Sequence, residues 1–257
     1  LADFAKKAIE KEELGKDSIT DFLALSFSST DYVGHLLGPR SMELQDTYLR
    51  LDQTIADFLT FLDKTVGKDN YLLFLTADHA GAENVGYLKD SKYAVDYISP
   101  KDIRKSLADF STKTFGANLV LNYSNFNLFF NKEIIKSNGL DLIKVKQSFK
   151  DFLMTKNYMK RVYTEEEILA STGSDYFLNF IAKGYDATQN GDLVLLQKPG
   201  YSEHGALGTS HGTPYSYDTH VPAIFYGWHV KPGESYAKKE ITSIAPTIAQ
   251  KIKITFP

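Results

Sequence analysis

Apolar residues in the first part of the chain form short continuous runs separated by a longer amphipathic stretch. The runs FLALSF (22–27) and YLLFL (71–75) have the length of buried strands. Between them, apolar residues recur at helical spacing over 44–62, and Gly67 supplies a stop. Apolar strands separated by helices are typical of a parallel sheet covered on both faces. The pattern therefore predicts an α/β fold with a mostly parallel sheet flanked by helices.

The pattern changes in the middle of the chain, over residues 91–190. The segment NLVLNYSNFNLFF (118–130) contains alternating apolar and polar positions with a turn near Ser124, which predicts a hairpin. A helical stretch follows over 133–159. We expect 91–190 to form a small α+β insertion or cap.

Two later apolar runs predict that the main sheet resumes after this insertion. These runs are LVLL (193–196) and VPAIFYGW (221–228), and a helix over 241–252 closes the chain. The predicted core therefore comprises residues 1–90 and 191–257.

Composition excludes several kinds of site. The chain has no cysteine, which excludes disulfides, thiolate metal sites and cysteine nucleophiles, so His, Asp or Glu would have to hold any metal. A net charge of -3 gives no general attraction to nucleic acid or to acidic membranes. No apolar run approaches the roughly 18 residues of a membrane-spanning helix. We therefore expect no nucleic-acid partner and no membrane span.

Two polar motifs directly follow the predicted strands. Asp31 and His35 lie in SSTDYVGH, and Asp78 and His79 lie in TADH. In open α/β sheets, ligands bind beyond the carboxyl ends of the strands, which is where both motifs stand. Each motif also has an ordinary structural interpretation: a capping aspartate with a surface histidine, or a loop aspartate paired with a histidine. The shared position at strand ends favours a common site.

The stretch GTSHG (208–212) fits two kinds of chemistry. As G-x-S-x-G it matches a hydrolase nucleophile elbow with Ser210 as the nucleophile, but an elbow needs a strand directly before and a helix directly after the serine. The flanks KPGYSEHGA and TPYSYDTHVP do not supply them, because Pro214 and Pro222 oppose a helix. We therefore favour His211, as a candidate metal ligand, over Ser210 as the functional residue of this loop.

Six histidines occur in the chain, and three of them stand outside the predicted site. His204 in SEHG is ambiguous, His220 precedes a predicted strand, and His229 follows one. Two of the other histidines, His35 and His211, join Asp31 in one set. This set offers one oxygen and two nitrogen ligands with a fourth position open, as in a catalytic zinc site. Asp78 and His79 offer the start of a second site, as two-metal phosphoryl-transfer enzymes require.

The motifs SFSSTDYVGHLLGP, FLTADH and HGTPYSYDTHVPAIFYG resemble those of the alkaline phosphatase superfamily. They look most like the phosphate-irrepressible alkaline phosphatases and the type I phosphodiesterase/nucleotide pyrophosphatases, over nearly the whole chain. The resemblance assigns one zinc to Asp31, His35 and His211, and a second zinc to Asp78 and His79. In the family, an Asp and a Thr or Ser nucleophile complete the second site, and both lie upstream of the part that this chain matches.

The resemblance thus implies the C-terminal portion of a two-zinc phosphatase, with no catalytic nucleophile in this chain and an inactive fragment on its own. The expected substrate is a small phosphate monoester, hydrolysed through a phospho-Thr or phospho-Ser intermediate. One alternative is a phosphodiesterase or nucleotide pyrophosphatase of the same superfamily; another is an inactive metal-binding fragment. The family implies a periplasmic or secreted protein. An unpaired sheet edge is expected to favour a dimer.

Overall fold

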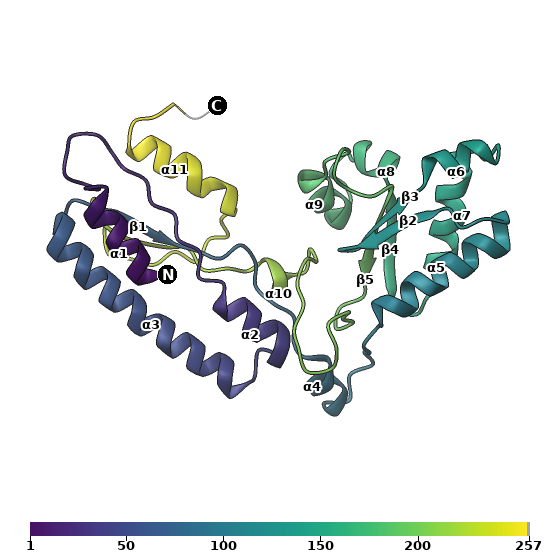
Figure 1. The fold of residues 1–257 in the computed structure, drawn as a ribbon, viewed down its shortest axis with the longest axis horizontal. Coiled ribbons are helices and arrows are strands. Elements are labelled where there is room, and N and C mark those ends of the chain that lie inside the picture. The colour runs from purple at the N-terminus through teal and green to yellow at the C-terminus, as the bar shows by residue number, and fades with distance from the viewer. Residues whose placement is uncertain (256–257) are drawn as a thin grey trace. The chain divides into compact units, whose positions relative to one another are not determined.

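The structure is a computed structural model that describes residues 1–255 (Figure 1). The chain divides into two compact units: unit 1 holds Leu1–Tyr32, Met42–Asp78 and the chain from Val221 onward, and unit 2 holds Val33–Ser41 and His79–His220. These boundaries differ from the expected ones, because 33–41, 79–90 and 191–220 group with the expected insertion. Among the described residues, no helix combines the length and the apolar character needed to cross a membrane.

Unit 1 contains helices packed on each other and one pair of strands. Helix α1 packs on α3 through Ala5 and Ile9, which bury their side chains with Phe58 and Leu62. A π-helical turn extends α3 and ends at Gly67, the predicted stop, which has a φ of 102°. The elements are α1 (Ala2–Lys11), α3 (Met42–Leu62), η1 (Asp63–Gly67), β1 (Leu72–Leu75), β6 (Ile224–Gly227), η2 (Ile241–Ser243) and α11 (Ile244–Lys251).

The strand pair of unit 1 corrects the prediction of a mostly parallel sheet. Strand β1 pairs with β6 in antiparallel register, with Leu72 opposite Gly227. Residues 22–27 form no strand: Phe22 lies near Phe74 of β1, with ring centroids 6.5 Å apart, but the segment has no ladder partner within residues 1–255. An apolar run indicates burial, whereas strand direction depends on which distant segment supplies the hydrogen bonds.

Unit 2 is built on a four-stranded antiparallel sheet in the order β2-β3-β5-β4. The predicted hairpin is confirmed: β2 and β3 are joined at Asn125 and Phe126, both with positive φ, as a two-residue turn of the I′ kind requires. The strands are β2 (Val120–Ser124), β3 (Asn127–Phe130), β4 (Met159–Thr164) and β5 (Leu193–Gln197).

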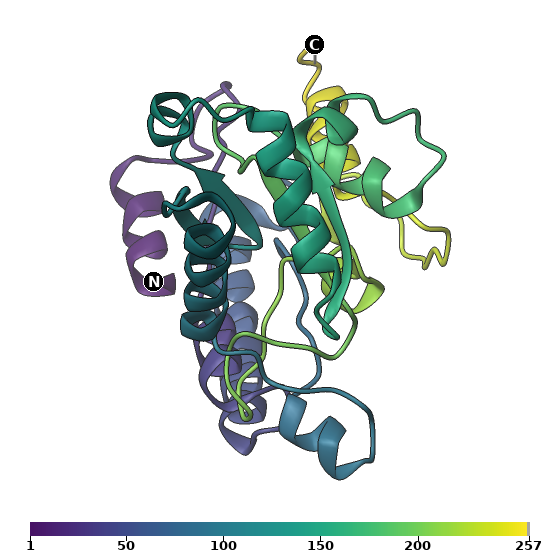
Figure 2. The same ribbon diagram turned by 90° about the vertical axis from the view of Figure 1, so that its right-hand side faces the viewer.

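Helices cover both faces of this sheet. Figure 2 views it from the side of α5 and α7, which lie in front of the strands. Leu193 and Leu195 of β5 pack with that helix group, while Val194 and Leu196 pack on the opposite face with α8 and α9. The helices are α5 (Pro100–Phe115), α6 (Lys132–Ser137), α7 (Leu142–Met154), α8 (Glu165–Leu169) and α9 (Tyr176–Gly184).

The run LVLL therefore belongs to the sheet of unit 2, and its assignment to the main sheet was wrong. The run is continuously apolar because helices cover both faces of β5, a condition that an antiparallel sheet meets as well as a parallel one. The helical stretch over 133–159 is two helices, α6 and α7, separated where Asn138 and Gly139 break the helical backbone.

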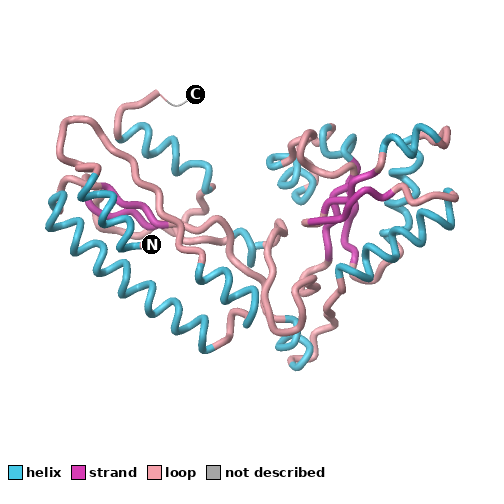
Figure 3. The backbone as a smooth tube through the Cα atoms, in the orientation of Figure 1, coloured by secondary structure: helices cyan, strands magenta, loops and turns pink. Residues whose placement is uncertain are grey.

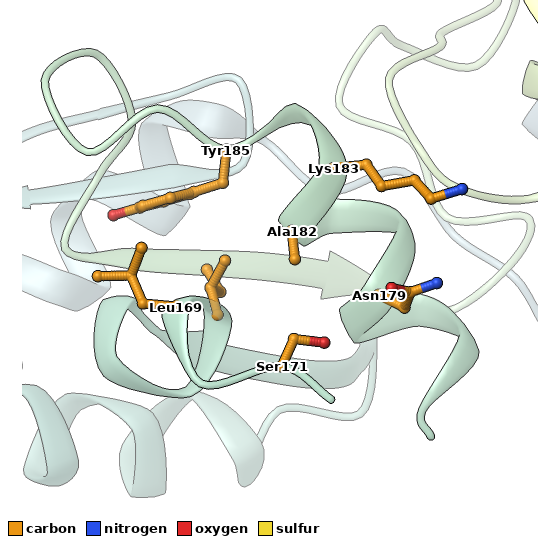
Figure 4. A pocket seen from close by; sticks show the side chains of 7 residues that line it. Leu169, Ser171, Asn179, Ala182, Lys183 and Tyr185 are labelled. Atoms are coloured by element: carbon orange, nitrogen blue, oxygen red, sulfur yellow. The ribbon is translucent and has the colours of Figure 1, made fainter. Parts of the chain in front are cut away.

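One pocket of unit 2 lies between α8 and α9 (Figure 4). It has a volume of 290 Å³, and its wall includes the side chains of Asn179, Lys183 and Tyr185. None of the histidines lines it. The predicted site residues therefore lie elsewhere in the chain.

Candidate metal centre

Helix α2 (Ser29–Leu37) carries Asp31 and His35. The four-residue spacing places both side chains on the same face of the helix, one turn apart. Asp31 stands in the first turn, where the free N–H groups and the positive end of the helix dipole favour a carboxylate. The helix that the two residues share thus fixes them relative to each other.

A loop docks on the C-terminal half of this helix. The backbone N–H of Thr209 donates to the carbonyl oxygen of Gly34 at 3.0 Å. At Gly208, an added Cβ would overlap the carbonyl oxygen of His35, so only glycine permits this approach. The chain from β5 to helix α10 (Ser216–Thr219) runs largely as loop (Figure 3). It is therefore positioned by such contacts with the helix.

The docking orients the imidazole of His35. Its Nδ1 lies 3.0 Å from the carbonyl oxygen of Thr209. A carbonyl oxygen only accepts, so Nδ1 carries the proton and Nε2 keeps its lone pair. That Nε2 lies 3.1 Å from Nε2 of His211. Two nitrogens bound to one tetrahedral zinc at its usual bond length stand about 3.3 Å apart, so this spacing fits a shared ion.

Asp31 completes a group with the two histidines. One ligand atom from each of Asp31, His35 and His211 lies within 4.8 Å of the other two, and each residue is half-buried. Within residues 1–255, this is the one group of three or more such side chains with metal-ligand spacing. The structure thus brings together the three residues that the sequence proposes for the first zinc.

His79 lies against the same cluster. Its ring stacks on that of His211, with ring centroids 3.4 Å apart and an angle of 11° between the planes. Its Nδ1 lies 2.8 Å from the carbonyl oxygen of Ala80, so Nδ1 is again the protonated nitrogen and Nε2 is left to bind a ligand. Asp78 precedes it, three residues after β1 ends at Leu75. Neither Asp78 nor His79 belongs to the group with metal-ligand spacing.

The structure adds His204 to the neighbourhood. Its ring stacks on that of His35 with centroids 4.9 Å apart. The sequence left this residue ambiguous, and the signal that could have placed it is Gly208, four residues later, where the loop closely approaches the carbonyl oxygen of His35.

Ser210 lacks the surroundings of a nucleophile elbow. The residue is 7% exposed, and its carbonyl oxygen accepts from the N–H of Ala82 at 2.9 Å. No strand directly precedes it, and the next helix, α10, begins only at Ser216. The strand-to-helix turn that defines a nucleophile elbow is therefore missing here.

Comparisons with known proteins show the family of the chain. A family model described as type I phosphodiesterase / nucleotide pyrophosphatase matches residues 2–220. The chain is 42% identical over 260 residues to a protein of Myroides odoratus named calcium-transporting ATPase. It is 38% identical over 255 residues to the alkaline phosphatase PafA of Elizabethkingia meningoseptica. These matches cover 99% and 98% of this chain, but 47% and 46% of the two relatives.

The structure also matches a crystal structure of wild-type alkaline phosphatase PafA, with a TM-score of 0.93 at 37% identity. That match covers 99% of this chain and 49% of the other, so the chain spans about half the length of the relatives it matches. The expected alkaline-phosphatase-like α/β fold is thereby confirmed. The chain belongs to the type I phosphodiesterase / nucleotide pyrophosphatase family, within the alkaline phosphatase superfamily.

Proposed function

We propose that the chain is the metal-binding part of a phosphoric ester hydrolase that acts on phosphate monoesters. The observation that carries this proposal is the convergence of Asp31, His35 and His211 on one point. The similarity to PafA, which is named an alkaline phosphatase, supports the same reaction class. Because the chain spans about half of its relatives, we propose that a Thr or Ser nucleophile comes from sequence outside it.

The donor set fits zinc. Asp31, His35 and His211 would hold one ion, and Asp78 with His79 would contribute to a second. When bound, zinc supplies positive charge that stabilises the charge developing on the phosphoryl group. The chain's own part is orientation: the carbonyl oxygens of Thr209 and Ala80 hold the protons of His35 and His79 on Nδ1 and leave Nε2 available.

The other properties of the whole protein follow from the same proposal. The substrate is a small phosphate ester, and the protein acts in the periplasm or outside the cell, as the resemblance to alkaline phosphatases implies. Pairing through the edges of the β1–β6 strand pair would give a dimer, since each of these strands pairs only with the other within residues 1–255.

A phosphodiesterase or nucleotide pyrophosphatase is the second candidate, and the description of the matching family favours it. Hydrolysis of p-nitrophenyl phosphate and of its bis ester by the full-length gene product separates the two. We expect faster hydrolysis of the monoester; a strong preference for the diester would establish the second candidate instead.

Metal binding is tested on the chain itself. We expect the 257-residue chain to bind Zn²⁺ and its His211→Ala variant to bind far less. The same variant in the full-length product should lose hydrolysis. If the unmutated chain takes up no zinc at equilibrium dialysis, the assignment of an assembled metal site to this chain is wrong, and it is an inactive fragment.

A further inference from the structure

The loop residue Thr209 contacts two of the segments that carry candidate metal ligands. Its backbone meets helix α2: the N–H donates to the carbonyl oxygen of Gly34 at 3.0 Å, and the carbonyl oxygen lies 3.0 Å from Nδ1 of His35. Its side chain faces the segment that follows His79, because the hydroxyl donates to the carbonyl oxygen of Ala82. One half-buried residue thus joins two segments that are far apart in the sequence.

The hydroxyl contact belongs to a closed pair of hydrogen bonds. The N–H of Ala82 donates to the carbonyl oxygen of Ser210 at 2.9 Å, so the loop takes both backbone polar groups of Ala82. The carbonyl oxygen of Ser210 also lies 3.4 Å from the Thr209 hydroxyl, a longer and therefore weaker contact. A Cβ added at Gly81 would lie 3.3 Å from the same hydroxyl oxygen. The side chain of Thr209 therefore lies directly against this backbone.

The position of this backbone determines how His79 is held. Nδ1 of His79 lies 2.8 Å from the carbonyl oxygen of Ala80, two residues before Ala82. Because each residue has only two soft backbone torsions, anchoring Ala82 restricts where the Ala80 carbonyl can point. The rings of His79 and His211 stack at the same junction, since His211 follows Thr209 by two residues. The hydroxyl of Thr209 thus acts on His79 through the backbone that carries it.

We propose that Thr209 is a positioning residue for both groups of candidate ligands. Its backbone carbonyl orients His35 of the first site, and its hydroxyl holds the segment that carries His79 of the second site in a fixed position relative to His35. Residues that orient metal-binding histidines act in this way without touching the ion. The contact with His35 does not involve the side chain, so a substitution of Thr209 separates the two roles. The inference rests on the proposed metal site.

Thr209→Val tests the proposal, because it removes the hydroxyl, keeps the branched shape and leaves the carbonyl oxygen of Ala82 without that donor. Amide hydrogen exchange and the ring-nitrogen chemical shifts of the histidines are measured on the metal-free 257-residue chain. We expect exchange of the Ala82 N–H to accelerate by about fivefold, the effect of losing one hydrogen bond. The ring nitrogens of His79 should shift, whereas those of His35 should change little.

Two further variants separate positioning from a general loss of stability. Thr209→Ser keeps the hydroxyl and should restore both readouts. The matched control is Thr164→Val: Thr164 is 8% exposed in strand β4, and its hydroxyl accepts from the N–H of Glu167 at 3.3 Å. This control should leave Ala82 and His79 unchanged even where it lowers stability. If Thr209→Val does not fold, Thr209→Ala is measured in the same way.

Three results overturn the inference. The first is that Thr209→Val changes neither the exchange of Ala82 nor the shifts of His79. The second is that Thr209→Ser has the same effect as Thr209→Val, because the hydroxyl is then not the group that matters. The third is an equal shift at His35 and His79, which would mean that the loop leaves helix α2 as a whole.

The outcomes also separate this inference from the proposed function. If the unmutated chain binds no zinc while Ala82 and His79 still respond to Thr209→Val, the metal site is wrong and the positioning role stands. If the unmutated chain binds zinc and neither readout responds, the metal site stands and the role of Thr209 is wrong. In the full-length gene product, Thr209→Val should lower kcat/KM for p-nitrophenyl phosphate by about 10-fold, as loss of a partner outside the ligand shell does; an unchanged value contradicts the role.

Discussion

Two regions of unit 2 are held together in different ways. The sheet body (residues 100–197) buries large apolar side chains on both faces of its sheet, among them Leu128, Phe149 and Leu193, each 0% exposed. The histidine segments (33–41, 79–86 and 204–220) bury mostly glycines and polar residues: Gly34, Gly38, Val85, Gly208, Ser210, Pro214 and Asp218.

Backbone contacts replace apolar burial in the histidine segments. Their N–H groups donate across the segments, from Ala80 to Asp218, from Gly86 to Ala206 and from Thr209 to Gly34. Such contacts fix the spacing of the imidazoles but add little apolar burial, which is the dominant source of stability. We therefore expect that the packing of the sheet body can be perturbed without changing the proposed metal binding, since each depends on its own region.

The largest effect on folding should come from the core of the sheet body. Phe149→Ala removes a ring that contacts Phe110 and Phe130, at centroid distances of 5.0 and 4.8 Å. We expect a loss of about 3–5 kcal/mol in the free energy of unfolding, measured by urea denaturation. Ile143→Ala, at an exposed position of the same helix, is the control. Zinc affinity should stay unchanged below the melting temperature; a parallel loss would show that the two regions are not separable.

The largest effect on metal binding should come from the histidine segments. His35→Ala removes an imidazole whose Nε2 faces His211. We expect zinc affinity to fall by more than about 100-fold, because loss of a ligand exceeds the usual effect of losing its hydrogen-bond partner. The unfolding of the metal-free chain should change little. His229→Ala, an exposed histidine outside the cluster, serves as control in isothermal titration with Zn²⁺. Equal binding by both variants would contradict the assignment of His35.

The sequence predicted the two regions unequally well. The hairpin at 120–130 and the helix at 42–62 were readable because turn residues and helical spacing are local signals. Asp31 and His35 were proposed from their place after a predicted strand, but residues 22–27 form no strand. Helix α2 places the two residues instead, since four residues along one helix define a face. The direction of β1 and β6, and the sheet to which β5 belongs, depend on distant partners that a local pattern does not name.

The environment of Asp218 and His204 was also beyond local patterns. Aspartate is usually exposed, so nothing in YDTHVP indicates that Asp218 is buried. His204 stacks on His35 where Gly208 lets the loop fold against helix α2, a contact between segments far apart in sequence. Both placements result from tertiary contacts between segments far apart in sequence.

Gly208→Ala tests whether close backbone approach holds the histidine segments. The new methyl group would overlap the carbonyl oxygen of His35 and push the loop from helix α2. We expect a cost of about 1–3 kcal/mol in stability, together with weaker zinc binding. Gly184→Ala is the matched control, because an added Cβ there meets no atom within 4 Å. Thermal unfolding measures the change in stability, and competition with a chelator measures the change in zinc affinity. If Gly208→Ala leaves both at the values of the unmutated chain, the loop is positioned in another way.

The smallest effect concerns Glu203, which joins the two regions. Its Oε1 accepts from the hydroxyl of Tyr123 at 2.6 Å and from the amide of Gln197, both in the sheet body, and His204 follows it. Burial raises the pKa of Glu203 above its ordinary value of 4.5, against the hydrogen bonds from Tyr123 and Gln197. Because the pKa of Glu203 is higher in the folded state than in the unfolded state, protonation stabilises the fold at pH values below the pKa of the unfolded state. This stabilisation is lost as the pH rises through the pKa of the folded state.

Glu203→Gln removes this titration but keeps an oxygen that can accept from Tyr123. The unfolding free energies of the unmutated metal-free chain and of the variant are compared. We expect the unmutated chain to lose stability relative to the variant as pH rises from about 4 to 6. Subtracting the variant cancels the contributions that both proteins share. Glu12→Gln, at an exposed position after α1, provides the control. A difference that stays constant over this range would mean that the link between the sheet body and the histidine segments does not depend on the protonation of Glu203.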